Sequence, residues 1–133
     1  MYFIALRRAM GKAYENALTN SRLLTPQYEP DGCFYTYYTF SAKFNGNAEG
    51  ISWADFRKKY ISFGGDGMYA ASKLLHQEPA FRDQKIGHGD TPVAIELQKN
   101  LMNFTTNQAD GEERETQIDA LRKTLEYFGD TAT

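Results

Sequence analysis

The spacing of apolar side chains along the chain predicts a series of amphipathic helices. Between residues 2 and 18 the apolar positions follow the i, i+3, i+4, i+7 spacing of one helical face, and related spacings return at 53–62, 68–77, 92–104 and 110–128. Ser52 with Asp55, and Asp110 with Glu113, place an acid three residues after a capping residue, which is typical of a helix start. The pattern therefore predicts five helices.

A different periodicity runs from residue 33 to residue 44. Apolar, aromatic and small side chains alternate there with a period of two, so that Tyr35 and Tyr37 share one side and Phe34, Tyr38 and Phe40 share the other. Because a lone strand is unstable, we expect partner strands just before residue 31 and just after residue 46, where turn sequences occur. This region predicts a small antiparallel sheet of two or three strands.

The last two predicted helices are joined by a short polar connection at 105–110. Helices linked so closely most simply form an antiparallel hairpin. The final helix carries a narrow apolar seam made of Ile118, Leu121, Leu125 and Phe128. The expected fold is therefore a mostly helical α+β single domain over residues 1–133, with about five helices, a small two- or three-stranded antiparallel sheet and a C-terminal helical hairpin.

Composition limits the classes of function. The chain has 133 residues, of which 41% are hydrophobic and 24% are charged, close to the averages of globular proteins. Its net charge of −2 and its pI near 5.7 argue against non-specific binding to nucleic acid, which needs an excess of basic residues. Cys33 is the single cysteine, so no internal disulfide is possible. The start of the chain lacks the features of a secretory signal, and no stretch predicts a membrane span. We expect a cytoplasmic protein without a membrane partner.

Candidate chemistry is sparse. A glycine-rich loop at 64–67 contains Asp66, and a loop at 87–91 contains His88 and Asp90, which offers a general base with an orienting acid. The sequence holds no nucleophile motif and no HExxH, CxxC or EF-hand spacing, so no catalytic residue, no metal and no cofactor is predicted. A small enzyme or ligand binder built from these two loops remains one alternative.

A local basic patch is the second alternative, with Arg7, Arg8 and Lys12 beside the run from Arg57 to Lys59 forming a nucleic-acid interface. The absence of catalytic motifs and the tyrosine-rich strand favour a third function. We expect a non-catalytic module for binding another protein or a copy of itself, of the accessory, regulatory or virion-assembly type. Its predicted interface consists of Tyr35, Tyr37, Ile118, Leu121, Leu125 and Phe128.

Overall fold

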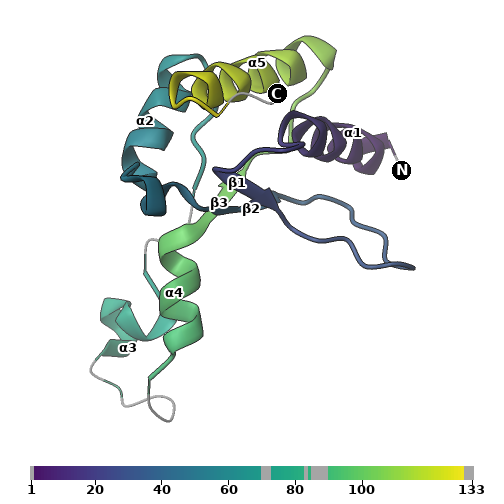
Figure 1. Ribbon diagram of the computed structural model, residues 1–133. Helices are drawn as coiled ribbons and strands as arrows, with labels where there is room; N and C mark the ends of the chain where they lie inside the picture. The colour runs from purple at the N-terminus through teal and green to yellow at the C-terminus, as the bar shows by residue number, and fades with distance from the viewer. Residues whose placement is uncertain (1, 70–72, 83, 85–89, 131–133) are drawn as a thin grey trace.

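The protein is described here by a computed structural model that covers residues 2–69, 73–82, 84 and 90–130. Three long helices, α1 (Tyr2–Ala17), α2 (Trp53–Ser62) and α5 (Gly111–Tyr127), lie on one side of a small sheet (Figure 1). The short helix α3 (Pro79–Arg82) and helix α4 (Pro92–Asn100) project from the sheet as a separate lobe, together with the 3-10 turn η2 (Leu75–Gln77). A second 3-10 turn, η1 (Gly46–Glu49), precedes α2.

The sheet has three antiparallel strands in the order β1 (Leu24–Pro26), β2 (Phe40–Phe44) and β3 (Leu101–Phe104). Strand β2 is central: Leu24 is paired with Phe44 on one side of it, and Phe104 is paired with Phe40 on the other. Over the described residues the chain has five α-helices and about 52% helix. The α+β, mostly helical character predicted from the sequence is confirmed.

The core fills the space between the sheet and the three long helices. Its centre is aromatic: the ring of Tyr14 lies 5.0 Å from that of Phe40 and 5.2 Å from that of Phe104, and Tyr60 meets Phe104 edge-on at 5.7 Å. Each of these four side chains is at most 1% exposed. Aromatic pairs in such offset and edge arrangements add about 0.5–1.5 kcal/mol each to the effect of burial.

The long strand predicted at 33–44 is confirmed only over Phe40–Phe44. Residues 27–39 instead form an extended arm beyond the end of β1, which leaves them without a strand partner (Figure 1). Tyr37 interrupts the alternation, because its φ of 50° is in the left-handed region and turns its side chain into the core. The partner strand expected before residue 31 is β1, which pairs with β2. The partner expected after residue 46 is not formed, because the other neighbour of β2 is β3, from much later in the chain.

The helix predicted at 92–104 is too long by four residues. Helix α4 ends at Asn100, and the next residues form β3 with no loop between them. Within β3, Met102 and Phe104 are buried while Leu101 and Asn103 are half-buried. Burial thus alternates with a period of two, but over four residues the sequence does not distinguish this strand from the end of a helix. Because β3 lies between α4 and α5, the predicted C-terminal hairpin is not confirmed, and α5 instead packs against α1 and α2.

The helix predicted at 68–77 is also misplaced. Met68 is buried in the core, and Tyr69 forms an isolated antiparallel bridge with Asn103, with backbone hydrogen bonds of 2.8 and 2.9 Å. This pairing holds the start of the segment in an extended form, and helical structure begins only at Leu75. Residues 70–72 lie outside the described part of the chain.

Both predicted capping patterns are confirmed. The Ser52 hydroxyl accepts from the Asp55 backbone N–H at 3.0 Å, and the Asp110 carboxylate accepts from that of Glu113 at 2.9 Å. Helices α2 and α5 therefore begin where the sequence predicts. None of the helices among the described residues is long and apolar enough to cross a membrane.

Candidate functional site

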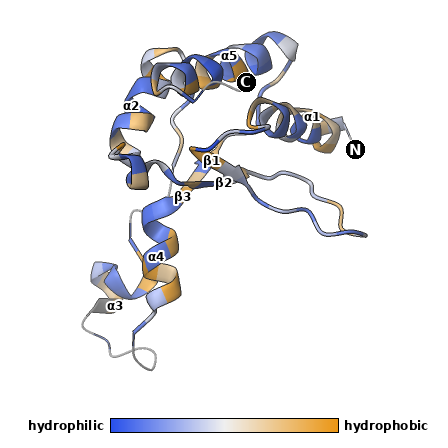
Figure 2. Cartoon of the chain, in the orientation of Figure 1, coloured by the Kyte–Doolittle hydropathy of each residue, from blue (hydrophilic) through white to orange (hydrophobic). Residues whose placement is uncertain are grey.

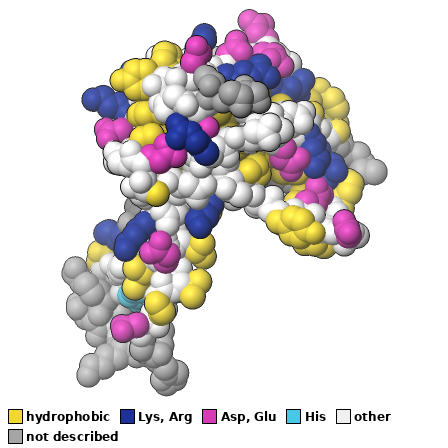
Figure 3. Space-filling model, viewed as in Figure 1, with side chains coloured by type: hydrophobic (Ala, Val, Ile, Leu, Met, Phe, Trp, Pro, Cys, Tyr) yellow, Lys and Arg dark blue, Asp and Glu magenta, His cyan; other side chains and the backbone are white. Residues whose placement is uncertain are grey.

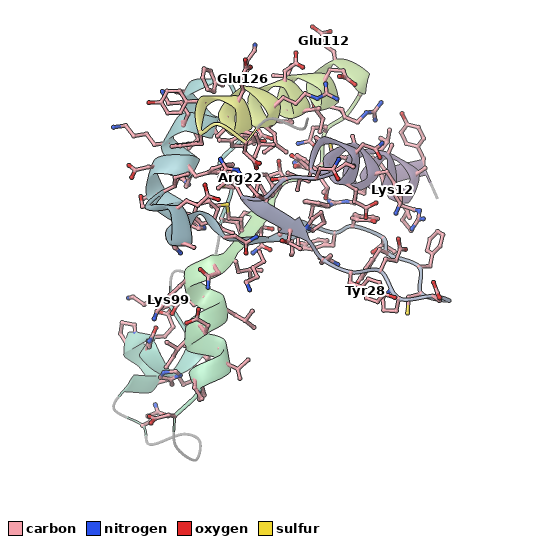
Figure 4. All side chains as sticks on the ribbon, viewed as in Figure 1. Lys12, Arg22, Tyr28, Lys99, Glu112 and Glu126 are labelled. Carbon is pink, nitrogen blue, oxygen red and sulfur yellow. The ribbon has the colours of Figure 1, made fainter. Side chains whose placement is uncertain are left out.

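The arm, residues 27–39, packs along one side of α1 (Figure 4). Lys12 of α1 forms ion pairs of 2.8 Å with Glu15 and 3.0 Å with Glu29 of the arm. The Tyr37 hydroxyl donates to Glu15 at 2.5 Å, and the Arg8 guanidinium donates to the Tyr35 carbonyl. The two carboxylates hold the pKa of Lys12 above its ordinary value. Helix α1 thus fixes where the arm begins and ends.

Arg7, the residue before Arg8 on α1, lines both parts of a surface depression. Its guanidinium donates to the Tyr38 carbonyl at 2.5 Å and to the Thr106 hydroxyl at 3.0 Å, and it also lies over the ring of Tyr38, 5.2 Å from the centroid. Arg7 therefore joins three separate segments, which are α1, the end of the arm and the chain after β3. We call this region the Arg7 depression.

The depression has two parts that meet at Arg7, Thr106 and Asn107. The larger, of about 390 Å³, lies between the start of α1 and segment 106–109, and the smaller, of about 220 Å³, lies between the arm and Tyr69. The walls of the larger part are apolar on the α1 side, whereas the smaller part is lined mainly by polar groups. Together the lining residues are Tyr2, Phe3, Leu6, Arg7, Tyr38, Tyr69, Thr105, Thr106, Asn107, Gln108 and Ala109.

A hydrogen-bonded layer supports the floor of the depression. The Asp66 carboxylate accepts from the Thr105 hydroxyl at 2.9 Å and from the Gln108 side-chain amide at 3.1 Å. Beneath it the Gln117 side-chain oxygen accepts from the Asp66 backbone N–H at 2.7 Å and from the Tyr60 hydroxyl at 2.8 Å. Loop 64–67 is therefore tied to segment 105–108 and to α5.

The tyrosines below this layer remain neutral over the ordinary pH range. Burial is the main reason that the pKa of Tyr60 is raised, and Tyr14 and Asp66 contribute. Burial likewise raises the pKa of Tyr14, whose hydroxyl donates to the Thr105 carbonyl at 3.2 Å. Both hydroxyls act as hydrogen-bond donors within the core and not as acids.

The lining of the depression is suited to binding, and it lacks the groups for proton transfer at neutral pH. The Arg7 guanidinium, the Tyr38 hydroxyl and the Asn107 amide can donate to oxygen atoms of a ligand, whereas the Tyr69 hydroxyl donates to the Thr39 hydroxyl at 3.1 Å and can accept from a ligand. Among the described residues, no carboxylate, imidazole or amine lines either part. In the described ranges no three or more His, Cys, Asp or Glu residues are grouped so that they could hold a metal ion.

The residues predicted as an interface are drawn mainly into the core of the chain itself. Tyr37, Ile118, Leu121 and Leu125 are buried, and Tyr35 and Phe128 are partly buried against the same core. The apolar seam of α5 thus faces α1 and α2. The tyrosines that do reach the surface near the arm are different ones, Tyr28 and Tyr38.

The two loops predicted to form an enzymatic site are not brought together by the contacts described. Asp66 binds to segment 105–108, whereas Asp90 is exposed just before α4, at the end of that helix far from the sheet (Figure 1). Nine helical residues separate Asp90's neighbour Thr91 from β3, a length of about 13 Å. His88 lies outside the described residues.

The basic residues of the second alternative have different neighbours. Arg7, Arg8 and Lys12 contact the arm, whereas Arg57 donates to the Met68 carbonyl at 3.0 Å and Lys59 lies 3.8 Å from the centroid of the Tyr127 ring. Figure 3 shows dark blue side chains in separate groups on this face. Helices α1 and α2 both pack against α5. No direct ion pair or stacking contact links the two groups in the described residues.

Sequence reasoning did not find the Arg7 depression. Arg7 and Thr106 are 99 positions apart, and Tyr69 belongs to a segment predicted as helix. The one available signal was the basic pair Arg7-Arg8 within an amphipathic helix, a pattern that usually marks a solvent-exposed face.

Comparison with models of protein families and with characterised proteins gave no match. Solved structures do match. The aminotransferase TlmJ from Streptoalloteichus hindustanus is 20% identical over 96% of this chain and 33% of its own, with a TM-score of 0.75. The aminotransferase PseC from Helicobacter pylori, involved in pseudoaminic acid biosynthesis, is 11% identical over 96% of this chain and 34% of its own, with a TM-score of 0.76. DesI, solved in the presence of its TDP-sugar product, is 18% identical over 92% and 31%, with a TM-score of 0.72.

These likenesses establish the fold and correct the function predicted from the sequence. The prediction of a non-catalytic, protein-binding or virion-assembly module is wrong, because nearly the whole chain has the fold of a part of aminotransferases. The related expectation that the chain is not enzymatic is wrong for the same reason. The chain spans about a third of the length of the enzymes that it matches.

Proposed function

We propose that this chain is part of a pyridoxal-phosphate-dependent aminotransferase that acts on a sugar. The observation that carries the proposal is the match over 96% of the chain to TlmJ at a TM-score of 0.75. Support for a sugar substrate comes from PseC, which is involved in pseudoaminic acid biosynthesis, and from DesI, which was solved in the presence of its TDP-sugar product. Pyridoxal phosphate, when bound, supplies an electron sink that stabilises the carbanion formed during amino transfer.

The described residues do not form a complete cofactor site. Pyridoxal phosphate needs a lysine that can be a neutral nucleophile, in an apolar pocket or beside another cation. Lys12 is held between two carboxylates that raise its pKa, which is the opposite environment. No lysine lines the Arg7 depression. We propose that the cofactor and its lysine lie in the two thirds of the matched enzymes' length that this chain does not span.

The contribution of this chain is a binding wall. Arg7, Tyr38 and Asn107 present donors around the hydrogen-bonded floor, and sugar hydroxyls and phosphate oxygens are acceptors that suit such groups. The floor is fixed by Asp66 and Gln117, so the donors need little reordering when a ligand binds. The absence of an acid or base from this lining fits a part that positions substrate while groups elsewhere transfer protons.

The test uses the gene product as it occurs in its own cells. A tag at the 3′ end of the coding sequence allows purification of the polypeptide or complex that contains this chain. We expect a visible absorbance that borohydride bleaches, and amino transfer from an amino acid to a nucleotide-linked keto sugar. Material that carries no pyridoxal phosphate, even when purified with an excess of it, would contradict the proposal.

A matched pair of variants tests the binding wall in that active material. Tyr69→Phe removes a hydroxyl from the smaller part of the depression, where it lies 3.1 Å from the Thr39 hydroxyl. We expect the variant to raise KM for the sugar by about 5- to 10-fold, the usual effect of one lost hydrogen bond, and thermal unfolding measured in parallel separates this effect from the lost contact with Thr39. Tyr28→Phe removes an exposed hydroxyl on the arm, outside the depression, and should leave KM unchanged. Equal effects of the two variants would show that the depression does not bind the substrate.

A further inference from the structure

The lobe, which is the described part of residues 73–100, has no buried side chain among those that the structure describes. Three of its large apolar side chains are mostly exposed: Leu75 at 70%, Val93 at 72% and Leu97 at 51%. Figure 2 shows apolar positions on α4, and Figure 3 shows apolar side chains gathered on the surface of the lobe. The body of the protein, by contrast, has a continuous buried core.

Among the described residues the lobe has few contacts: α3 packs on η2, and α4 contacts β2. Ordering one residue costs about 1–2 kcal/mol of backbone entropy, and burial of apolar surface is the main term that offsets this cost. Helix α4 has nine residues and α3 has four, whereas an isolated helix is marginal in water below about 12–15 residues. The lobe therefore needs a surface outside this chain to bury its apolar face.

Helix α4 shows which side that surface covers. Val93 and Leu97 are four positions apart, so they lie one turn from each other on the same helical face. A pair of apolar side chains at this spacing is the usual anchor of a helix that packs into an apolar groove. The charged Lys99 is exposed on the same helix and serves as a reference position (Figure 4).

The comparisons identify what supplies the groove. A match over 96% of a 133-residue chain leaves out too few residues to omit the lobe, so the lobe belongs to the shared fold. The matched enzymes are about three times as long as this chain, and that remaining length is absent here. We propose that Leu75, Val93 and Leu97 pack into an apolar groove on the remaining two thirds of the aminotransferase, an inference that rests on the proposed function.

Hydrogen exchange measured by mass spectrometry tests this inference on two samples: the isolated chain, and the tagged gene product purified from its own cells. In the isolated chain we expect peptides from 73–82 and 90–100 to exchange as unfolded peptides do, while peptides from α5 are protected. In the native material the lobe should gain about 100-fold protection, the effect of a partner present at 100 times its dissociation constant. A lobe that is protected in the isolated chain, or unprotected in the native material, would overturn the inference.

Two variants sharpen the result. Val93→Glu combined with Leu97→Glu should abolish the protection of the lobe in the native material and leave the Tm of the isolated chain unchanged, because neither side chain is buried there. The control Lys99→Glu should keep the protection. If protection of the isolated lobe instead rises with the chain's own concentration, a second copy covers it and the proposed partner is wrong.

The outcomes separate this inference from the proposed function. Native material that carries pyridoxal phosphate while its lobe stays unprotected would overturn the docking and leave the function standing. Native material with a protected lobe but without cofactor would overturn the function, and with it the identity assigned to the partner.

Discussion

The ring of Tyr37 lies directly over the backbone of Gly11, in the space that a side chain at position 11 would occupy. A Cβ built on Gly11 would lie 2.5 Å from Cγ of that ring. Tyr37 reaches this position through a left-handed backbone conformation, with φ at 50°. The arm is therefore fastened to α1 by shape as well as by the ion pairs of Lys12.

Gly11→Ala should destabilise the protein even though alanine favours helix. The gain in helix propensity is about 1 kcal/mol, whereas forcing a methyl group into an occupied site costs about 1–3 kcal/mol and must displace Tyr37. We expect a net loss of up to about 2 kcal/mol in urea unfolding. Gly111→Ala is the control, because its Cβ would meet only the Arg114 side chain at 3.5 Å. Equal stability of the two variants would mean that the arm does not rest on Gly11.

Asp130→Ala should be among the most destabilising changes near the end of α5. The buried Asp130 carboxylate accepts from the Ser21 hydroxyl at 2.6 Å and from the Leu23 backbone N–H at 3.1 Å. Its removal leaves a buried N–H unpaired, so we expect a loss of about 2–3 kcal/mol in chemical unfolding. The control Asp119→Ala removes an exposed carboxylate paired with Arg122 at 3.8 Å and should change stability by less than about 0.5 kcal/mol.

Thr106→Val tests the junction beneath Arg7. The Thr106 hydroxyl lies 2.6 Å from the Tyr37 carbonyl and accepts from Arg7 at 3.0 Å, and valine has nearly the same shape without the hydroxyl. We expect a loss of about 1–3 kcal/mol, measured by thermal unfolding, because a buried carbonyl loses its donor. Thr116→Val, at an exposed position on α5, is the matched control and should be close to neutral. A neutral Thr106→Val would show that the carbonyl finds water.

The stability of the protein should fall at alkaline pH because of Tyr14 and Tyr60. Burial raises the pKa of both hydroxyls in the folded state, so the unfolded chain loses their protons first. Their contribution is fully present below about pH 10, the ordinary pKa of tyrosine, and is lost as pH rises through the higher pKa of the folded state. Urea unfolding at several pH values should show this decline.

Tyr60→Phe is the variant that isolates one of these groups. It should reduce the decline in stability above about pH 10, since one of the two shifted hydroxyls is gone. At neutral pH it should cost about 0.5–1.5 kcal/mol for the lost hydrogen bond to Gln117. The control Tyr127→Phe removes an exposed hydroxyl and should leave the alkaline decline as it is. An unchanged slope in Tyr60→Phe would contradict the assignment.

The sequence predicted the elements whose patterns are long and local. Helices α1, α2 and α5 follow from apolar spacing, and the caps at Ser52 and Asp110 fix two of their starts. Strand β3 could not be found in this way, because four residues that continue a helix carry too short an alternation. These residues form a strand because they pair with β2, about sixty positions earlier, and no local pattern predicts that contact.

The site was harder to predict than the fold for a related reason. Asp66 was among the residues singled out from the sequence, but its partners Thr105 and Gln108 are about forty positions away, and nothing in the sequence links them. The apolar seam predicted as an interface on α5 is buried. The sequence could not indicate this, because an apolar seam has the same pattern whether another chain or the chain's own helices cover it. Tyr37 was predicted to lie on an exposed strand face. Its left-handed φ could not be foreseen, because tyrosine, unlike glycine, does not indicate such a backbone conformation.

The direct join between α4 and β3 has a mechanical consequence. Helix α4 ends at Asn100 and β3 begins at Leu101, and the segment that follows β3 carries Thr105 and Thr106. With no linker at Leu101, the direction of α4 is set by the edge strand from which the helix extends. A surface that covers the lobe therefore touches a helix continuous with the strand that leads to Thr106, the residue that binds Arg7.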